Sequence, residues 1–390
     1  MHYTFHRTHH EIPEWNEVAA IGGLYSSSEW VSMFAPTWVA VRSEGTVLAV
    51  VPCVSATGSA MLPGLTEPDY LFTYDGNQAA VEVPVDEIYP VLFCGAARGY
   101  TCRLLIRDGL APATRAAVVA HLVKAVRELG ERQGAKLIIF GFLPSPDVEE
   151  LLAIDGNLGA VFNEAECMLG PVESFDAYLA SCRCKAKREI SRFEAMGFRI
   201  ERPRLRDVFD AVAEVVTEHE RKFDPGVTLD AIRGFISPYL EPGLDERTRV
   251  FCAWQGETLF GASLSIAYGR TYHSRFGSVR ADAPRAAAVQ FNVAYYAPIR
   301  AAIDEGSTVH YGMNGVETKV VRGCRARSLW TVLDPRIAWS EGLRRRLRDM
   351  AKVRFDLTTP VLRKYQPEEL VREELGLGTQ LVSSIRIADS

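Results

Sequence analysis

The alternation of apolar and polar positions divides the first half of the chain into short strands and amphipathic helices. Two β-branched runs, residues 37–42 and 46–54, flank a Ser-Glu-Gly turn and predict a β-hairpin. Apolar positions at helical spacing predict a helix over 112–133, and the unbroken apolar run 136–140 predicts a strand buried in a sheet. The remaining expected elements of this half are a strand at 102–107 and a helix at 147–154.

The second half repeats the order of hairpin, strand, helix and strand. A second hairpin is expected at 249–254 and 258–268, followed by a third antiparallel strand at 270–279. A helix at 289–305 and a closing strand at 308–311 complete the copy. The elements expected ahead of this hairpin are helices at 174–196, 205–223 and 229–240 and a strand at 198–201. The economical interpretation is a duplicated α+β unit.

Length and composition fit this organisation. A chain of 390 residues exceeds one small domain, and 47% hydrophobic with 24% charged residues is ordinary globular usage. The domains expected are 1–165, 166–335 and a basic helical C-terminal tail at 336–390.

The sequence predicts a cytoplasmic protein without a metal site. No stretch has the apolar core of a signal peptide or the length of a membrane-spanning helix. The eight cysteines lack the spacing of a metal knuckle, because Cys182-Arg-Cys184 has no second pair, so reduced, buried thiols are expected. Histidines gather near the N-terminus, but terminal residues are usually mobile, so no metal is assigned to them.

Charge is distributed unevenly along the chain. Residues 183–206 carry a net charge of +6 and residues 322–364 carry +8, so the rest of a chain with net charge −5 carries −19. Such asymmetry is typical of a protein that binds a polyanion, although solvated helix faces also produce charge runs. Both segments together favour RNA as the partner.

Two stretches resemble a known family. The basic segment from Tyr178 to Arg192 (YLASCRCKAKREISR) is similar to the entry helix of the Fem-type peptidoglycan-bridge aminoacyltransferases and their antibiotic-pathway relatives. The segment from His310 to Lys319 (HYGMNGVETK) is similar to the "G..G.E..K" segment that follows the last helix in that family. This resemblance covers residues 170–325 and implies two tandem GNAT-like domains, each a mixed, mostly antiparallel sheet flanked by helices.

The family resemblance also implies an acyltransferase. Acetyl-CoA-using members of the superfamily cradle pyrophosphate in a glycine-rich turn at a helix start, but the equivalent residues here, 280–288, contain no glycine. Fem-type enzymes lack that loop and take their acyl group from aminoacyl-tRNA. The function expected is therefore transfer of an aminoacyl group to a small amine, hydroxylamine or peptide-like acceptor, in natural-product or cell-wall biosynthesis, with no cofactor.

Three residues are the expected catalytic candidates. Lys319 follows the closing strand beside a glycine-containing turn, where a fixed cation can stabilise the oxyanion of acyl transfer by ~3–4 kcal/mol; a surface lysine paired with Glu317 is the alternative. Glu317 is the candidate to accept a proton from the attacking ammonium, or to orient Lys319. His273, predicted to share a strand face with Arg275, is the candidate general base, although a lone strand histidine is more often structural.

The remaining candidates contact RNA or substrate rather than catalyse. Two alternatives to the hypothesis of transfer from aminoacyl-tRNA remain open: an acyl-CoA N-acyltransferase of the same fold and a non-catalytic RNA-binding protein. The expected binding residues are Arg183, Lys185, Lys187, Arg188, Arg275, Asn314, Arg344, Arg345, Arg346 and Arg348.

Overall fold

The computed structural model describes residues 1–34, 36–58, 85–337, 339–372 and 374–375. These residues divide into two compact units, one made of residues 1–166 and 327–390 and the other of residues 167–326. The boundary falls inside two strands, β7 (Gly159–Leu169) and β13 (Arg325–Pro335). The described residues of the expected C-terminal tail at 336–390 are thus grouped with the first unit.

The first unit is a mixed sheet with strand order β1-β2-β3-β4-β6-β13-β7, in which β5 pairs beside β3. The expected hairpin is confirmed, because β2 and β3 pair antiparallel around Glu44 and Gly45. The parallel pair β4–β6 gives the sheet its mixed character. Its further strands are β1 (His2–His6), β2 (Thr37–Ser43), β3 (Thr46–Ala56), β4 (Val91–Cys94), β5 (Leu105–Ile106) and β6 (Leu137–Pro144).

Helix α5 (Pro112–Arg132) packs on this sheet and buries its apolar stripe against it. Pro112 starts the helix, where its missing N–H costs nothing, and Gly134 follows the end at φ +66°. Every residue of β6 is buried, as its continuous apolar run predicts. The other helices are α1 (Trp15–Ala19), α2 (Ser28–Ser32), α4 (Val85–Ile88), α6 (Ser145–Ile154) and α14 (Glu341–Tyr365).

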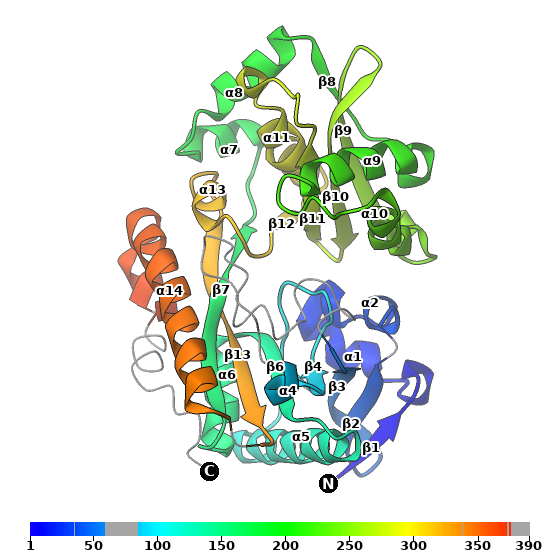
Figure 1. Cartoon of the computed structure of the whole chain (residues 1–390), viewed down its shortest axis with the longest axis vertical. Helices are drawn as coiled ribbons and strands as arrows, with labels where there is room; N and C mark the ends of the chain where they lie inside the picture. Colours follow the sequence, from blue (N-terminus) through cyan, green and yellow to red (C-terminus); the bar gives the residue numbers. More distant parts are fainter. Residues whose placement is uncertain (35, 59–84, 338, 373, 376–390) are drawn as a thin grey trace. The chain divides into compact units, whose positions relative to one another are not determined.

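Helix α14 lies alongside β7 and β13 (Figure 1). The Phe355 ring contacts the Phe162 ring of β7 at a centroid distance of 5.5 Å, and the Glu374 carboxylate accepts the Ser328 amide of β13 at 2.8 Å. Buried apolar side chains fix this basic helix in the first unit, where the charge pattern alone suggested a separate tail.

The second unit is a sheet with strand order β12-β11-β10-β9-β8, to which the end of β7 adds beside β12. Strands β8 to β11 pair antiparallel, whereas β11 and β12 are parallel. Helices α9 and α10 lie on one another with α9 against β9–β11. The strands are β8 (Phe198–Glu201), β9 (Thr248–Gln255), β10 (Thr258–Tyr268), β11 (Thr271–Val279) and β12 (Thr308–His310).

The helices of the second unit differ from the predicted ones at two breaks. The predicted helix 174–196 is interrupted at residues 182–185, because the Arg183 amide donates to the Val321 carbonyl at 3.0 Å instead of to its own helix. The predicted helix 289–305 contains the π-helical turn η7, followed by Pro298, which has no N–H to donate. The helices are α7 (Phe175–Ser181), α8 (Ala186–Ala195), α9 (Leu205–Glu220), α10 (Leu229–Ile236), α11 (Val289–Phe291), η7 (Asn292–Tyr296), α12 (Ala297–Asp304) and α13 (Val316–Val320).

The turn η7 packs closely against the sheet. A Cβ on Gly277 of β11 would lie 2.4 Å from the Ala294 Cβ, so only glycine fits there. The Ser263 hydroxyl of β10 donates to the Val293 carbonyl at 2.6 Å. This contact fixes the helix that carries one wall of the groove described below.

Candidate functional site

Two buried histidines meet where β11 and β12 pair. His273 and His310 are register partners on the parallel strands, and their rings lie 5.4 Å apart. Burial lowers the pKa of His273 well below its ordinary value, and the neighbouring His310 and Arg275 lower it further. His273 is therefore neutral at pH 7, the state a general base needs, on a side chain only 8% exposed.

Arg275 is the extra residue of a β-bulge. The consecutive residues Leu264 and Ser265 of β10 pair with Phe276 and Ser274, so the register skips Arg275. Its Nε donates to the Tyr239 hydroxyl at 3.1 Å, while Phe276 contacts Phe235 of the same helical segment. The predicted alternation placed Phe276 on the opposite face from Arg275; the bulge brings both side chains to this segment.

Lys319 is buried at the end of β12. It is 7% exposed, and its ammonium donates to the main-chain carbonyls of Tyr311 at 2.8 Å, Gly312 at 3.2 Å and Met313. The bonded residues directly follow His310, so the structure brings Lys319 to the strand end that carries the histidine pair. The surface-lysine alternative fails because the side chain is buried.

The other motif residues lie at the surface of the same turn. Asn314 is exposed and has φ +66°, between two glycines that also have positive φ, Gly312 and Gly315. Glu317 is exposed in the first turn of α13. The side chains of Asn314 and Glu317 are therefore exposed to solvent, whereas the buried Lys319 ammonium is hydrogen-bonded to the backbone of the turn.

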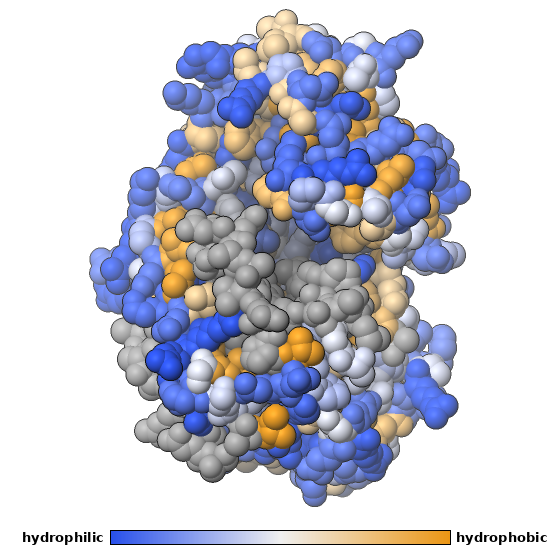
Figure 2. Space-filling model, viewed as in Figure 1, coloured by the Kyte–Doolittle hydropathy of each residue, from blue (hydrophilic) through white to orange (hydrophobic). Residues whose placement is uncertain are grey.

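The basic residues around α8 are exposed. Arg183 and Lys185 lie in the bend between α7 and α8, and Lys187 and Arg188 lie in the first turn of α8. Hydrophilic side chains cover most of the face of the molecule seen in Figure 2. All four predicted RNA-contacting cations of this segment are therefore accessible to solvent.

The arginines of α14 are less accessible than their sequence suggests. Only Arg345 is exposed among Arg344, Arg345, Arg346 and Arg348. Arg344 and Arg348 form ion pairs with Glu341 at 3.3 and 2.7 Å. Part of the positive charge of this helix is thus neutralised within the helix itself.

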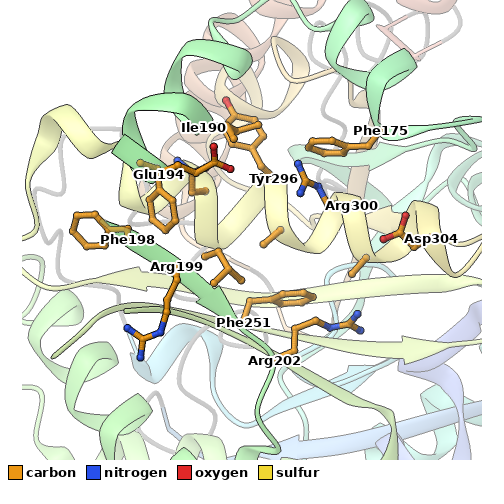
Figure 3. Close-up of a pocket in the computed structure, with 15 residues that line it drawn as sticks. Phe175, Ile190, Glu194, Phe198, Arg199, Arg202, Phe251, Tyr296, Arg300 and Asp304 are labelled. Atoms are coloured by element: carbon orange, nitrogen blue, oxygen red, sulfur yellow. The ribbon is translucent and has the colours of Figure 1, made fainter. Parts of the chain in front are cut away.

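A groove of about 460 Å³ opens in the second unit between α8, β8 and α12 (Figure 3). Its walls are aromatic, and its rim carries charged groups from several elements. The Arg300 guanidinium stacks 4.3 Å over the Phe175 ring, whereas Arg202 is paired with Glu305 at 2.9 Å. The lining residues are Phe175, Ile190, Phe193, Glu194, Phe198, Arg199, Ile200, Arg202, Phe251, Asn292, Tyr296, Ala297, Arg300, Ala301 and Asp304.

The turn between β11 and α11 has little capacity for a pyrophosphate. Its Ala281 amide donates to the Glu218 carboxylate at 2.7 Å, and Arg280 of the same turn pairs with that carboxylate at 3.4 Å. Ala288, the residue before α11, adopts a left-handed conformation with φ +51°. Further amides already bonded to carbonyls are those of Arg280, Ala283, Ala287, Ala288, Phe291 and Asn292.

The described part of the chain holds neither a metal-binding cluster nor a membrane-spanning helix. Among those residues, His, Cys, Asp and Glu side chains do not gather in a set of three that could hold a metal ion. Within the same part of the chain, no helix has both the length and the apolar character to cross a membrane.

Residues 180–317 match the model of the acetyltransferase (GNAT) domain family. The second unit is a GNAT-type acyltransferase domain. The match begins inside α7 and ends in α13, so it contains the histidine pair, the bulge and the turn that follows β12. No curated protein sequence matches the chain.

Solved structures similar to the GNAT-type chain show the tandem fold. FemX has a TM-score of 0.57 at 12% identity, over 85% of this chain and 97% of FemX. The C-terminal domain of a putative lysylphosphatidylglycerol synthetase from Agrobacterium fabrum has a TM-score of 0.51 at 11% identity, over 90% of this chain and 96% of that one. L-PGS from Bacillus licheniformis has a TM-score of 0.50 at 11% identity, over 89% of this chain and 97% of L-PGS. The predicted α+β fold of two tandem GNAT-like units is confirmed.

Proposed function

We propose that this GNAT-type acyltransferase takes an aminoacyl group from aminoacyl-tRNA and forms an amide with a small amine or peptide-like acceptor. The observation that carries the proposal is the β11–α11 turn. Where a CoA-dependent relative needs free backbone amides, this turn has amides that already donate, one of them to the carboxylate of Glu218. A pyrophosphate would have to displace that carboxylate.

The exposed cations of the α7–α8 bend support a polyanionic donor. Arg183, Lys185, Lys187 and Arg188 lie within ten residues and are all exposed, so they can neutralise successive phosphates. Similarity to FemX and to a putative lysylphosphatidylglycerol synthetase agrees with aminoacyl transfer. The ester of aminoacyl-tRNA is already activated, so an amine can attack its carbonyl without ATP.

The groove suits the acceptor. Its walls carry aromatic side chains, and its lining includes the carboxylates of Glu194 and Asp304 together with the Arg300 guanidinium. An amino-acid-like acceptor carries both an ammonium and a carboxylate, so this mixed lining complements it. The candidate base His273, neutral at pH 7, and the turn held by Lys319 lie at the end of β12 and are not among the residues that line the groove.

One experiment tests the donor. Labelled aminoacyl-tRNA and acetyl-CoA are incubated separately with the protein and a mixture of amino acids, aminosugars and dipeptides, and amide products are sought by mass spectrometry. We expect product from aminoacyl-tRNA alone and its loss after RNase treatment. Product from acetyl-CoA without RNA would establish the CoA-dependent alternative. RNA binding with no product from either donor would establish the non-catalytic one.

A further inference from the structure

Two of the eight cysteines differ from the rest in accessibility. Cys182 and Cys184 are half-buried, whereas the other six thiols, all within described segments, are buried. The pair flanks Arg183 in the non-helical bend between α7 and α8. This arrangement departs from the buried thiols that the sequence predicts, and the acyl-transfer scheme gives the pair no role.

The two thiols lie against a polar cluster. The Cys182 thiol donates to the Arg322 carbonyl at 3.9 Å, and the Cys184 Sγ lies 3.6 Å from the Tyr296 hydroxyl. The Cys182 amide donates to the carbonyl of Tyr178 at 3.1 Å, and the Tyr178 side chain has no exposed surface. Tyr296 in turn donates to the Glu189 carboxylate and lines the groove.

A buried cation completes this cluster. The Arg322 side chain is 4% exposed, stacks 3.7 Å over the Phe291 ring, and approaches the Glu189 carboxylate at 3.5 Å. The neighbouring Cys182 thiol, the Tyr296 hydroxyl and the charge of Arg322 lower the pKa of Cys184 to about 6. The pKa of Cys182 is raised, first by the neighbouring Cys184 thiol and then by burial. At neutral pH the pair therefore holds one thiolate beside one thiol.

We propose that Cys182 and Cys184 form a redox-active dithiol that a peroxide converts to an intramolecular disulfide. The Cys184 thiolate attacks the peroxide O–O bond, becomes a sulfenic acid and releases hydroxide or alkoxide, which takes up a proton. The Cys182 sulfur then displaces the hydroxyl as water, and its own proton leaves with it. For hydrogen peroxide, two thiols and one peroxide give one disulfide and two waters.

The local backbone permits this bond. Residues two apart have Cα atoms separated by at most ~7 Å, which overlaps the range of about 4.4–6.8 Å found for disulfides. Residues 182–185 lie outside both helices, so the ring closes without breaking a helical hydrogen bond. A disulfide in so short and accessible a loop is the reversible kind. It would also rigidify the bend that displays Arg183 and Lys185.

The test uses the full-length protein with no RNA and no acceptor, so its result is independent of the proposed function. In the native protein, iodoacetamide should modify Cys184 ahead of the six buried cysteines. The alkylation rate of Cys184, followed by peptide mass spectrometry, should rise with a midpoint near pH 6. One equivalent of hydrogen peroxide should lower the intact mass by about 2 Da, and dithiothreitol should reverse the change.

Variants assign the two steps. Cys182→Ser should stop at a sulfenic acid on Cys184, a gain of about 16 Da that dimedone traps, whereas Cys184→Ser should show no fast reaction. If the serine variants do not fold, Tyr296→Phe serves instead, because loss of its hydrogen bond should shift the alkylation midpoint upward. Peroxide treatment that leaves both thiols free, or that oxidises buried cysteines equally fast, overturns the proposal.

Discussion

The Lys319 ammonium donates to the carbonyl of Tyr311 at 2.8 Å and, through its other protons, to the next two carbonyls along the chain. A single buried side chain thus fixes three consecutive residues after β12. The resemblance to the Fem-type family makes this lysine a candidate oxyanion stabiliser. In the structure, however, its ammonium donates its hydrogen bonds to main-chain carbonyls. The arrangement indicates a positioning residue for the turn.

Replacing Lys319 with Met should destabilise the second unit. Three carbonyls would lose a charged donor, and bonds to charged groups contribute about 1.5–3 kcal/mol, so we expect a loss of ~2–4 kcal/mol in local stability. Hydrogen exchange of peptides spanning residues 308–322 measures that loss. Lys187→Met, at an exposed position, is the control and should leave the exchange unchanged.

Kinetics of the same variant separate positioning from direct oxyanion stabilisation. If Lys319 acts in the transition state, Lys319→Met lowers turnover by ~100–1000-fold while hydrogen exchange stays close to wild type. If it positions the turn, turnover and local stability fall together. A variant with normal turnover and normal exchange would contradict both roles.

The exposed cations of α8 should bind RNA through phosphates. Lys187→Glu with Arg188→Glu removes two contacts, so the slope of log affinity against log salt should flatten by about 1.4–1.8. The matched control is Arg7→Glu with Lys124→Glu, which makes the same charge change at exposed positions of the first unit. Equal losses in the two double variants would mean that net charge, rather than this helix, governs binding; filter binding across a salt series measures both.

For α14 the structure sharpens the expectation drawn from the sequence. Arg345→Ala should reduce the salt dependence of RNA binding by about one phosphate contact with no change in melting temperature, since the side chain is exposed. Arg344→Ala also removes an ion pair with the exposed Glu341, which is worth less than about 1 kcal/mol. An unchanged salt slope in Arg345→Ala would show that this helix is not part of the RNA-binding surface.

Filling the groove tests the acceptor site. Ala297 lines the groove on α12 and is partly exposed, so Ala297→Phe should occupy part of its volume without entering the sheet core. We expect a KM for the acceptor raised at least tenfold with unchanged RNA affinity. Ala111→Phe, at an exposed position before α5, is the control. Unchanged acceptor kinetics would place the acceptor elsewhere.

How far the sequence predicts this structure depends on where the polar residues fall. The hairpins and β6 were predictable because each is a clean apolar pattern between turns. Strand β7 was not predicted, because Asn163, Glu164 and Glu166 interrupt its apolar run, although all three are buried. Glu166 pairs with Arg327 and Asn163 with Thr331, partners more than 160 residues away that no local pattern reveals.

The sequence predicted individual residues of the site but not their arrangement in space. The motif placed Lys319 after the last strand, and alternation put His273 beside Arg275, but neither shows that Lys319 bonds to the backbone or that Arg275 lies in a bulge. The groove was missed because its walls come from segments between Phe175 and Asp304 that meet only after folding. The thiol pair was visible in the sequence; its Arg322 and Tyr296 neighbours, which give Cys184 its chemistry, were not.

The pH dependence of stability should report on His273. Burial, and then the nearby His310 and Arg275, hold its pKa well below the ordinary value of about 6.5, so between these two values the unfolded chain binds a proton that the folded chain does not. The contribution of this group is therefore complete above pH 6.5 and is lost as pH falls toward the folded pKa, with a slope of at most ~1.4 kcal/mol per pH unit. His273→Gln should flatten the decline between pH 7 and pH 5, measured by hydrogen exchange in peptides spanning β11. His2→Gln, at an exposed position, should leave the decline as in the wild type. An undiminished decline in His273→Gln would mean that other groups cause the acid sensitivity of this strand.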